Sequence, residues 1–228
     1  MRFDVITVFP QWFEALRVSR IWRRAEESGV LELHIHDLRD FAGDPHRTVD
    51  DVPYGGGPGM VLKVEPLARA VESVEQTGPR KVLYASPQGR MLDQPWTEEL
   101  SKVSQLVLVA GRYEAVDERF VEGWVDESFS IGDYVLSGGE LPVMVLMEAV
   151  ARLIPGVVGD FESVVTDSFS SGLLKHPQYT RPAVFRGREV PDVLRTGNHA
   201  AIEEWRKGQA RERTKIRRPD LLVKGLSK

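Results

Sequence analysis

The sequence predicts an α/β domain with a mainly parallel sheet, followed by a small, mainly helical C-terminal domain. Over about the first 150 residues, apolar positions recur with period 2 in some segments and period 3.6 in others, which is typical of successive βα units. Near residue 160 the charge reverses: residues 1–166 hold 16 Lys and Arg against 27 Asp and Glu, and residues 167–228 hold 14 against 7. We therefore expect a first domain at 1–158, a linker at 159–166 and a basic helical domain at 167–228.

The elements of the first domain follow from its periodicity. Strands are predicted at 3–9, 31–36, 82–86, 106–110 and 124–130. Helices are predicted at 11–28, ending before Gly29, from about Pro66, and at 141–153, ending before Pro155. Residues 37–63 hold too many turn residues for a regular element, and loops of that length are more often functional than idle.

Composition excludes several classes of protein. The chain has 228 residues, 42% hydrophobic and 28% charged, which is ordinary for a folded globular protein. It has no cysteine, which excludes disulfides and thiolate chemistry and fits folding in a reducing compartment. Arg2 and Asp4 interrupt the first apolar run, and no uncharged stretch approaches the roughly 20 residues of a membrane helix. We expect a cytoplasmic protein without a membrane partner.

The basic C-terminal part on an acidic body indicates a polyanion as the partner of that part. A solvated, Arg-rich helical tail would have the same composition. Charge alone therefore leaves both interpretations open.

Three loops that follow predicted strands, at 84–90, 111–119 and 131–140, are rich in Gly, Ser and Tyr. Glycine lets a ligand approach backbone groups that can read a purine edge, and tyrosine offers a stacking face. Because the carboxyl ends of parallel strands meet at one edge, the loops predict one small-molecule pocket. The residues assigned to it are Tyr84, Ala85, Ser86, Pro87, Gly111, Tyr113, Glu114, Ile131, Gly132, Asp133, Tyr134, Val135, Leu136, Gly138 and Gly139.

Common phosphate and metal sites are not indicated. No GxGxxG follows a strand, and residues 55–63 lack the spacing of a P-loop, so NAD and ATP are not favoured. His34 and His36 alternate with apolar residues and are interpreted as solvent-facing positions. No metal ligand is predicted, and a GxSxG nucleophile motif is missing.

Several long strings in a fixed order resemble one family. They are HRTVDDVPYGGGPGM at 46–60, SPQGR at 86–90, GRYE with DER at 111–119, IGDYVLSGGELP at 131–142, RLIPGV at 152–157, DSF at 167–169, GLL at 172–174, YTRP at 179–182 and TGNHA at 196–200. Over essentially its whole length the chain resembles bacterial tRNA (guanine-N1)-methyltransferases, the TrmD family of the SPOUT class. One departure is Ala115, where the family usually has Gly.

The resemblance implies a deep trefoil knot in the parallel sheet, an exception to the rule that chains do not thread loops. It also implies S-adenosylmethionine in the three-loop pocket and a homodimer with active sites at the subunit interface. The implied reaction is methylation of N1 of the guanosine at tRNA position 37, which preserves the reading frame. Dependence on Mg²⁺ is implied as well, with Glu114 as a candidate for indirect contact.

The reaction needs a base and a cation, because N1 of neutral guanine carries a proton and the charge left by its removal moves largely onto O6. Carried over from the family motifs, Asp167 is the general base and Arg152 stabilises charge near O6. From sequence alone, the N-cap of a helix opening at Ser168 is the better interpretation of Asp167, and a cation in the last turn of a helix is the better interpretation of Arg152. The resemblance reverses that preference.

The resemblance implies that the polyanion bound by the basic domain is the anticodon branch of tRNA. The residues assigned to it are Lys175, Arg181, Arg206, Arg217 and Arg218. A related SPOUT methyltransferase on another RNA is one alternative, disfavoured by the YTRP and TGNHA strings. A non-catalytic RNA-binding module is another, disfavoured by the presence of both Arg152 and Asp167.

Overall fold

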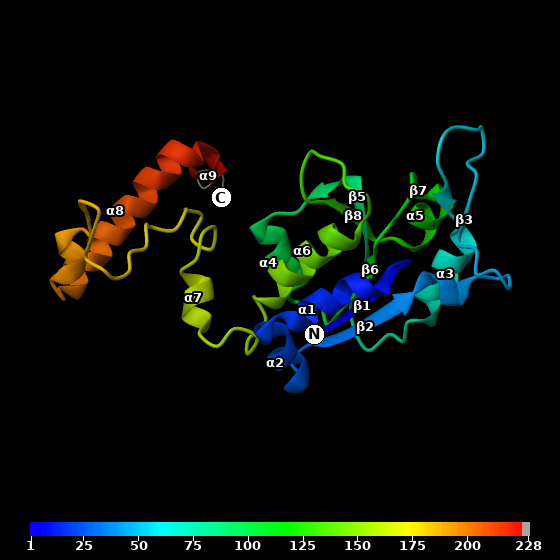
Figure 1. Cartoon of the computed structure of the whole chain (residues 1–228), viewed down its shortest axis with the longest axis horizontal. Coiled ribbons are helices and arrows are strands. Elements are labelled where there is room, and N and C mark those ends of the chain that lie inside the picture. The colour runs from blue at the N-terminus through cyan, green and yellow to red at the C-terminus, as the bar shows by residue number, and fades with distance from the viewer. Residues whose placement is uncertain (225–228) are drawn as a thin grey trace. The chain divides into compact units, whose positions relative to one another are not determined.

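The computed structural model describes residues 1–224 and divides into two compact units, Met1–Gly159 and Asp160–Lys228 (Figure 1). The predicted linker at 159–166 contains a short helix, α7 (Phe161–Val165), so that segment is not irregular throughout. The Asp160 carboxylate caps α7 by accepting from the N–H of Glu162. None of the helices in residues 1–224 combines the length and apolar character that a membrane span needs.

Unit 1 is built on a five-stranded parallel sheet, which confirms the α/β prediction. The order is β2-β1-β6-β5-β8, and every neighbouring pair is parallel. The strands are β1 (Arg2–Thr7), β2 (Glu32–Asp37), β5 (Arg80–Met91), β6 (Gln105–Val109) and β8 (Glu127–Ser130). The central strand β6 is buried along its whole length, since its run QLVLV has helices over both faces.

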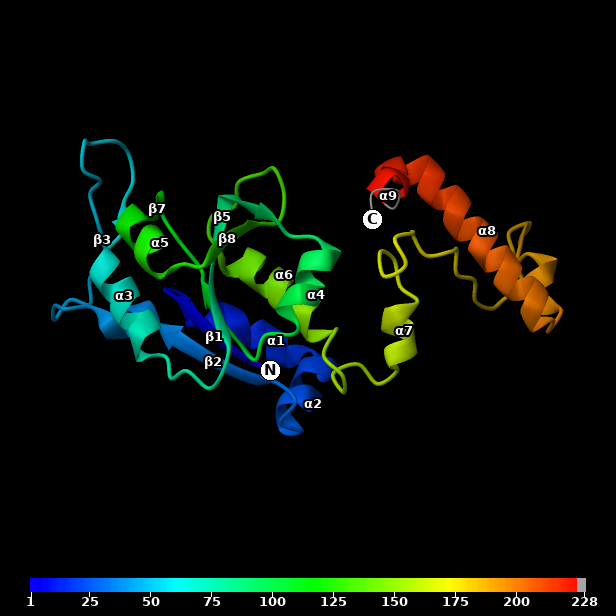
Figure 2. The same ribbon diagram turned by 180° about the vertical axis from the view of Figure 1, so that it is seen from behind.

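Helices cover both faces of the sheet (Figures 1 and 2). On one face, Trp22, Trp96 and Met147 contribute to a core that includes residues of α2, α4 and α6. On the other, Leu67 and Phe120 bury α3 and α5 against the sheet. The helices are α1 (Glu14–Val18), α2 (Arg20–Glu27), α3 (Val64–Ser73), α4 (Gln94–Leu100), α5 (Glu118–Trp124) and α6 (Glu140–Ala151). Burial of one apolar face per helix fixes this three-layer arrangement.

The predicted single helix at 11–28 is wrong. The chain instead forms a 3₁₀ turn, η1 (Pro10–Phe13), then α1, then α2, with a break at Ser19, whose ψ of 123° is extended. Leu16 and Trp22 still reach the same core on either side of the break. The apolar period therefore continues across Ser19, which is why the pattern did not reveal the break.

The segment at 37–63 is also more ordered than predicted. It contains a 3₁₀ turn, η2 (Leu38–Phe41), and two short strands, β3 (Asp50–Asp51) and β4 (Val61–Leu62). Strand β4 pairs with β3 and with β7 (Ala115–Val116), so the base of this segment is tied to the loop that follows β6. The tip is extended into solvent, where Tyr54 is fully exposed.

Strand β5 passes β8 in an unusual register. Ala85 and Arg90 both lie opposite Phe129, so residues 86–89 form an excursion between two paired halves of β5. A side chain on Gly89 would clash with the backbone of Ser128 and Phe129. Only glycine allows the two strands to approach this closely.

A buried carboxylate lies near the start of β1. Asp4 has no exposed surface and accepts hydrogen bonds from Arg2 at 2.8 and 2.9 Å and from Gln105 at 2.8 Å. His36 Nε2 lies 3.0 Å from the same carboxylate, so its interpretation as a solvent-facing residue is wrong. His34 is about half exposed, as predicted.

Unit 2 is smaller and rests on a long helix, α8 (His199–Arg217), capped by the side chain of Asn198. Thr214 on α8 is fully buried and accepts from the N–H of Leu174, which anchors the segment that begins at Asp167. The other elements are β9 (Val184–Phe185), β10 (Arg188–Glu189), a 3₁₀ turn, η3 (Asp192–Arg195), and α9 (Pro219–Lys224).

Candidate active site

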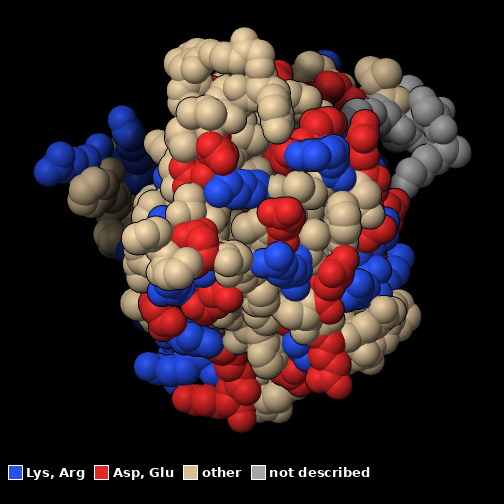
Figure 3. Space-filling view, turned by 90° about the vertical axis from the view of Figure 1, so that its right-hand side faces the viewer, with Lys and Arg blue, Asp and Glu red and all other residues tan. Residues whose placement is uncertain are grey.

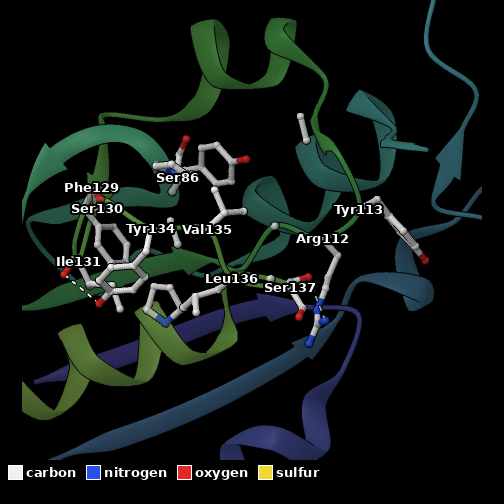
Figure 4. Close-up of a pocket in the computed structure, with 18 of the residues that line it drawn as sticks. Ser86, Arg112, Tyr113, Phe129, Ser130, Ile131, Tyr134, Val135, Leu136 and Ser137 are labelled. Carbon is white, nitrogen blue, oxygen red and sulfur yellow. Dashed lines mark hydrogen bonds between the residues drawn. The ribbon is translucent and has the colours of Figure 1, made fainter. Parts of the chain in front are cut away.

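A pocket of about 120 Å³ opens at the carboxyl ends of β6 and β8 and beside residues 84–87, in the middle of β5 (Figure 4). Every residue assigned to the predicted pocket lines it except Asp133. Six further lining residues were missed, of which four lie within or beside the predicted loops and were open to prediction by continuity. The six are Arg112, Ala115, Phe129, Ser130, Ser137 and Pro142. That the lining binds a cofactor stays a prediction.

Two of the loops are joined directly. The N–H of Gly139 donates to the carbonyl of Gly111 at 2.8 Å, and Arg112 pairs with Gly138 in an antiparallel bridge. The loop that follows β6 and the loop that follows β8 therefore form one wall of the pocket.

Tyrosines shape the pocket in different ways. Tyr84 is buried beneath Gly111, and burial raises the pKa of its phenol, which therefore stays neutral at ordinary pH. Tyr134 folds over its own loop and donates its hydroxyl to the carbonyl of Ile131 at 3.2 Å (Figure 4). Tyr113 is 44% exposed, and its φ of 64° lies in the left-handed region that non-glycine residues rarely occupy.

Arg112 and Glu140 form an ion pair beside the pocket, with 2.8 Å between Arg112 Nε and Glu140 Oε2. Arg112 also donates from Nη1 to the carbonyl of Ser137 at 3.1 Å, as Figure 4 shows. Neither charged residue was predicted as part of the site. Nothing in the sequence pattern marks Glu140 as buried, so the pattern also gave Arg112 no buried partner.

Glu114 lines the pocket next to the extended segment of 37–63. Its N–H donates to the carbonyl of Met60 at 3.0 Å, and its side chain lies against Gly59. Within residues 1–224, no group of three His, Asp or Glu side chains comes together as a metal site. Mg²⁺ in proteins is commonly held by only one or two carboxylates together with waters and substrate oxygens, so the lack of such a group among these residues does not bear on Glu114.

Arg152 belongs to unit 1 and directly follows the last residue of α6, as the C-cap of that helix. Its side chain is exposed, and a cation at this position is favoured by the helix dipole.

Asp167 belongs to unit 2. No helix begins at Ser168, so the interpretation of Asp167 as an N-cap is wrong. Its Oδ1 accepts from the N–H of Ser168 at 3.0 Å and lies 3.8 Å from Lys175 Nζ. The segment is held by further bonds, among them Lys175 N–H to Ser168 Oγ at 3.0 Å.

The basic residues assigned to tRNA differ in their surroundings. Arg181, Arg206 and Arg217 are exposed. Arg218 donates to both carboxylate oxygens of Asp220 at 2.9 and 2.7 Å, so part of its charge is compensated. On the side of unit 1 near α3 and β3, Figure 3 shows Lys and Arg interspersed with Asp and Glu. The excess of basic residues lies in unit 2.

A model of the family described as tRNA (Guanine-1)-methyltransferase TrmD matches residues 1–224. A tRNA (guanine-N(1)-)-methyltransferase of Persephonella marina is 54% identical over 98% of this chain and 89% of its own length. Proteins with the same name from Geobacter metallireducens and Frankia alni are 50% and 52% identical, over 99% and 98% of this chain and 93% and 85% of their own lengths.

Proposed function

Since the chain belongs to the tRNA (guanine-1)-methyltransferase TrmD family and so methylates N1 of guanine in tRNA, we propose that it uses S-adenosylmethionine and acts on position 37. The observation that carries the cofactor assignment is the junction of the Gly111 and Gly139 loops over Tyr84. Backbone groups and small residues line this wall, as recognition of an adenosine edge requires. When bound, S-adenosylmethionine supplies an electrophilic methyl group on a positive sulfonium.

Glu114 supports the same assignment, because a carboxylate in the lining suits a cationic cofactor. Any role of Mg²⁺ would then run through indirect contact with Glu114.

Asp167 is the proposed general base. Guanine N1 becomes a good nucleophile only when its proton leaves, and a positioned carboxylate accepts that proton as the methyl group is attacked. Ser168 N–H holds Asp167 Oδ1 in place, which limits the rotamers of the carboxylate. A base fixed in this way loses little entropy when the guanine arrives.

Arg152 is the proposed partner of O6. Removal of the N1 proton leaves negative charge largely on O6, and a guanidinium stabilises it through charge-assisted hydrogen bonds. The exposed position of Arg152 just after α6 leaves its side chain accessible to a nucleotide.

A trefoil knot in unit 1 is proposed from the family to which the chain belongs. The five-stranded parallel sheet of unit 1 is compatible with it. We propose that the pocket loops belong to this knotted region.

A homodimer with active sites at the subunit interface accounts for exposed apolar residues near the pocket. Leu141 and Val145, one turn apart on α6, are 45% and 46% exposed, and Val135 on the pocket rim is 83% exposed. Burial of such residues by a second copy is the usual explanation of an apolar surface on a folded domain.

Unit 2 is the proposed contact for the anticodon branch of tRNA. It carries 14 Lys and Arg against 7 Asp and Glu from residue 167 on, a balance suited to phosphates. The cytoplasm is the proposed place of action.

The test uses S-adenosylmethionine with a labelled methyl group and two tRNA transcripts that differ only at position 37, guanosine in one and adenosine in the other. We expect label in the guanosine transcript alone, at N1. Equal labelling of both would refute the position. Absence of label with bound cofactor would refute the reaction.

A further inference from the structure

The side chain of Arg112 connects the pocket to α6 and to the segment that follows β1. Besides the ion pair with Glu140 and the bond to the Ser137 carbonyl, its guanidinium lies 4.6 Å from the ring centre of Phe9 and 5.5 Å from that of Trp12. Arg112 is only 15% exposed. Cation–π contacts and a carboxylate together fix the orientation of a guanidinium that would otherwise move freely.

Glu140 keeps the Arg112 side chain in place through the ion pair, from a position outside the pocket lining. It is the first residue of α6 and 1% exposed, and it does not line the pocket. Its Oε1 accepts from Thr7 Oγ1 at 3.0 Å, and Thr7 Oγ1 in turn accepts from the N–H of Phe9 at 3.0 Å. The chain from Phe9 through Thr7 and Glu140 to Arg112 thus joins the end of β1 to the loop after β6.

Stability alone does not explain this buried pair. Desolvation of two charges offsets much of their attraction, and apolar residues of similar size often replace such a pair without loss of stability. The fixed position of Arg112 matters for the residues next to it. Tyr113 is held at a φ of 64°, a conformation that persists only where its surroundings impose it. Gly138 lies so close to Arg112 that a side chain there would clash with Arg112 Nε.

We propose that Glu140 is a positioning residue that acts through Arg112. It clamps the loop at 111–115 to the loop at 131–139 and so holds both in the conformation that binds the cofactor. The second part of this inference rests on the proposed use of S-adenosylmethionine. The clamp itself does not, which allows the two to be tested separately.

The first experiment measures amide hydrogen exchange in the cofactor-free protein. In Glu140→Gln, amides at 111–115 and 134–139 are expected to exchange at least about tenfold faster than in the unsubstituted protein, because local opening lacks the ion pair. Asp4→Asn is the matched control. Asp4 is also a fully buried carboxylate paired with an arginine, but at the other end of β1. Unchanged exchange in Glu140→Gln, or equal acceleration in both variants, would overturn the clamp.

A second variant keeps the test decisive if Glu140→Gln does not fold. Arg112→Lys keeps the positive charge but cannot reach Glu140, Ser137 and both rings at once, since lysine lacks the planar fork. The same two loops are expected to exchange faster, and protection equal to that of the unsubstituted protein would overturn the proposal.

The second experiment measures S-adenosylmethionine affinity by calorimetry. Glu140→Gln should weaken binding about tenfold and Asp4→Asn should leave it unchanged. If Glu140 acts through Arg112, Glu140→Gln has no further effect in an Arg112→Gln background. Additive losses would overturn that route. Failure of the unsubstituted protein to bind would refute the proposed cofactor, while the exchange result would still decide the clamp.

Discussion

Gly139 lies so close to Ala110 that a Cβ on Gly139 would stand 2.9 Å from the Cα of Ala110. The same Cβ would stand 2.9 Å from the backbone nitrogen of Gly111. Both neighbours are backbone atoms, so the loops must separate to admit even a methyl group. We therefore expect Gly139→Ala to weaken S-adenosylmethionine binding at least about tenfold in calorimetry, with overpacking costing about 1–3 kcal/mol of unfolding free energy.

Gly123 provides the control for that substitution. It lies inside α5, and a Cβ there would meet nothing within 4 Å. Gly123→Ala should raise the unfolding free energy by about 0.5–1 kcal/mol and leave cofactor affinity unchanged. Full affinity in Gly139→Ala would remove the two-loop wall from the cofactor site.

Asp4 predicts how stability depends on pH. Burial raises the pKa of its carboxyl, but hydrogen bonds from His36, Arg2 and Gln105 outweigh burial and lower it to about 2, from 3.8. A depressed pKa means that the folded state holds the carboxylate form, so its stabilisation is complete above about pH 5 and is lost as pH falls towards 2. This difference in pKa between the folded and unfolded states contributes about 2 kcal/mol to the free energy of unfolding.

The variant Asp4→Asn removes that dependence. Urea denaturation at pH 7, 5, 4 and 3 should show unfolding free energy falling less steeply for Asp4→Asn than for the unsubstituted protein over the lowest interval. Parallel curves would mean that Asp4 is not the ionised acceptor that its four contacts indicate.

Arg217 and Arg218 are neighbours that should behave differently towards tRNA. Arg217 is exposed, whereas Arg218 is paired with Asp220. Each lost phosphate contact reduces the slope of log affinity against log salt by about 0.7–0.9. We expect Arg217→Gln to reduce the slope by about that amount and Arg218→Gln by less, measured by filter binding. Equal slopes in all three proteins would mean that neither side chain contacts phosphate.

The pocket could be predicted in large part from sequence because its residues are local to strand ends. Loops rich in Gly, Ser and Tyr after three parallel strands converge at one edge whatever the order of those strands. The ion pair beneath them could not be predicted. Glu140 opens a helix, where an exposed carboxylate is common, and its burial depends on the position of Thr7 on a strand 133 residues earlier.

Features fixed by close approach were also beyond sequence reasoning. In the sequence, Gly89 resembles an ordinary turn glycine. In the structure, its lack of a side chain allows the backbone of β5 to approach that of Phe129 closely. His36 alternates with apolar residues like a solvent-facing position. It contacts Asp4 because β2 and β6 flank β1 and bury that carboxylate, which only the strand order shows.

Asp167→Asn tests the proposed base. Asparagine keeps the oxygen that accepts from Ser168 N–H, so the segment should retain its fold, but its amide cannot take the N1 proton. Single-turnover methylation should fall by about 100- to 10,000-fold, with melting temperature and cofactor affinity little changed. Asp160→Asn is the matched control, since Asp160 caps α7 and asparagine caps as well as aspartate. Its rate should stay near that of the unsubstituted enzyme.

The pH dependence of Asp167→Asn separates loss of the base from loss of position. As pH rises, more guanine N1 is deprotonated by solvent, so the rate of the variant should climb towards that of the unsubstituted enzyme. A misplaced substrate would give a low rate that does not recover at high pH. A fully active Asp167→Asn enzyme would disprove the assignment. The base would then have to be sought at Glu114, in the pocket lining, or at Asp133 in the loop that follows β8.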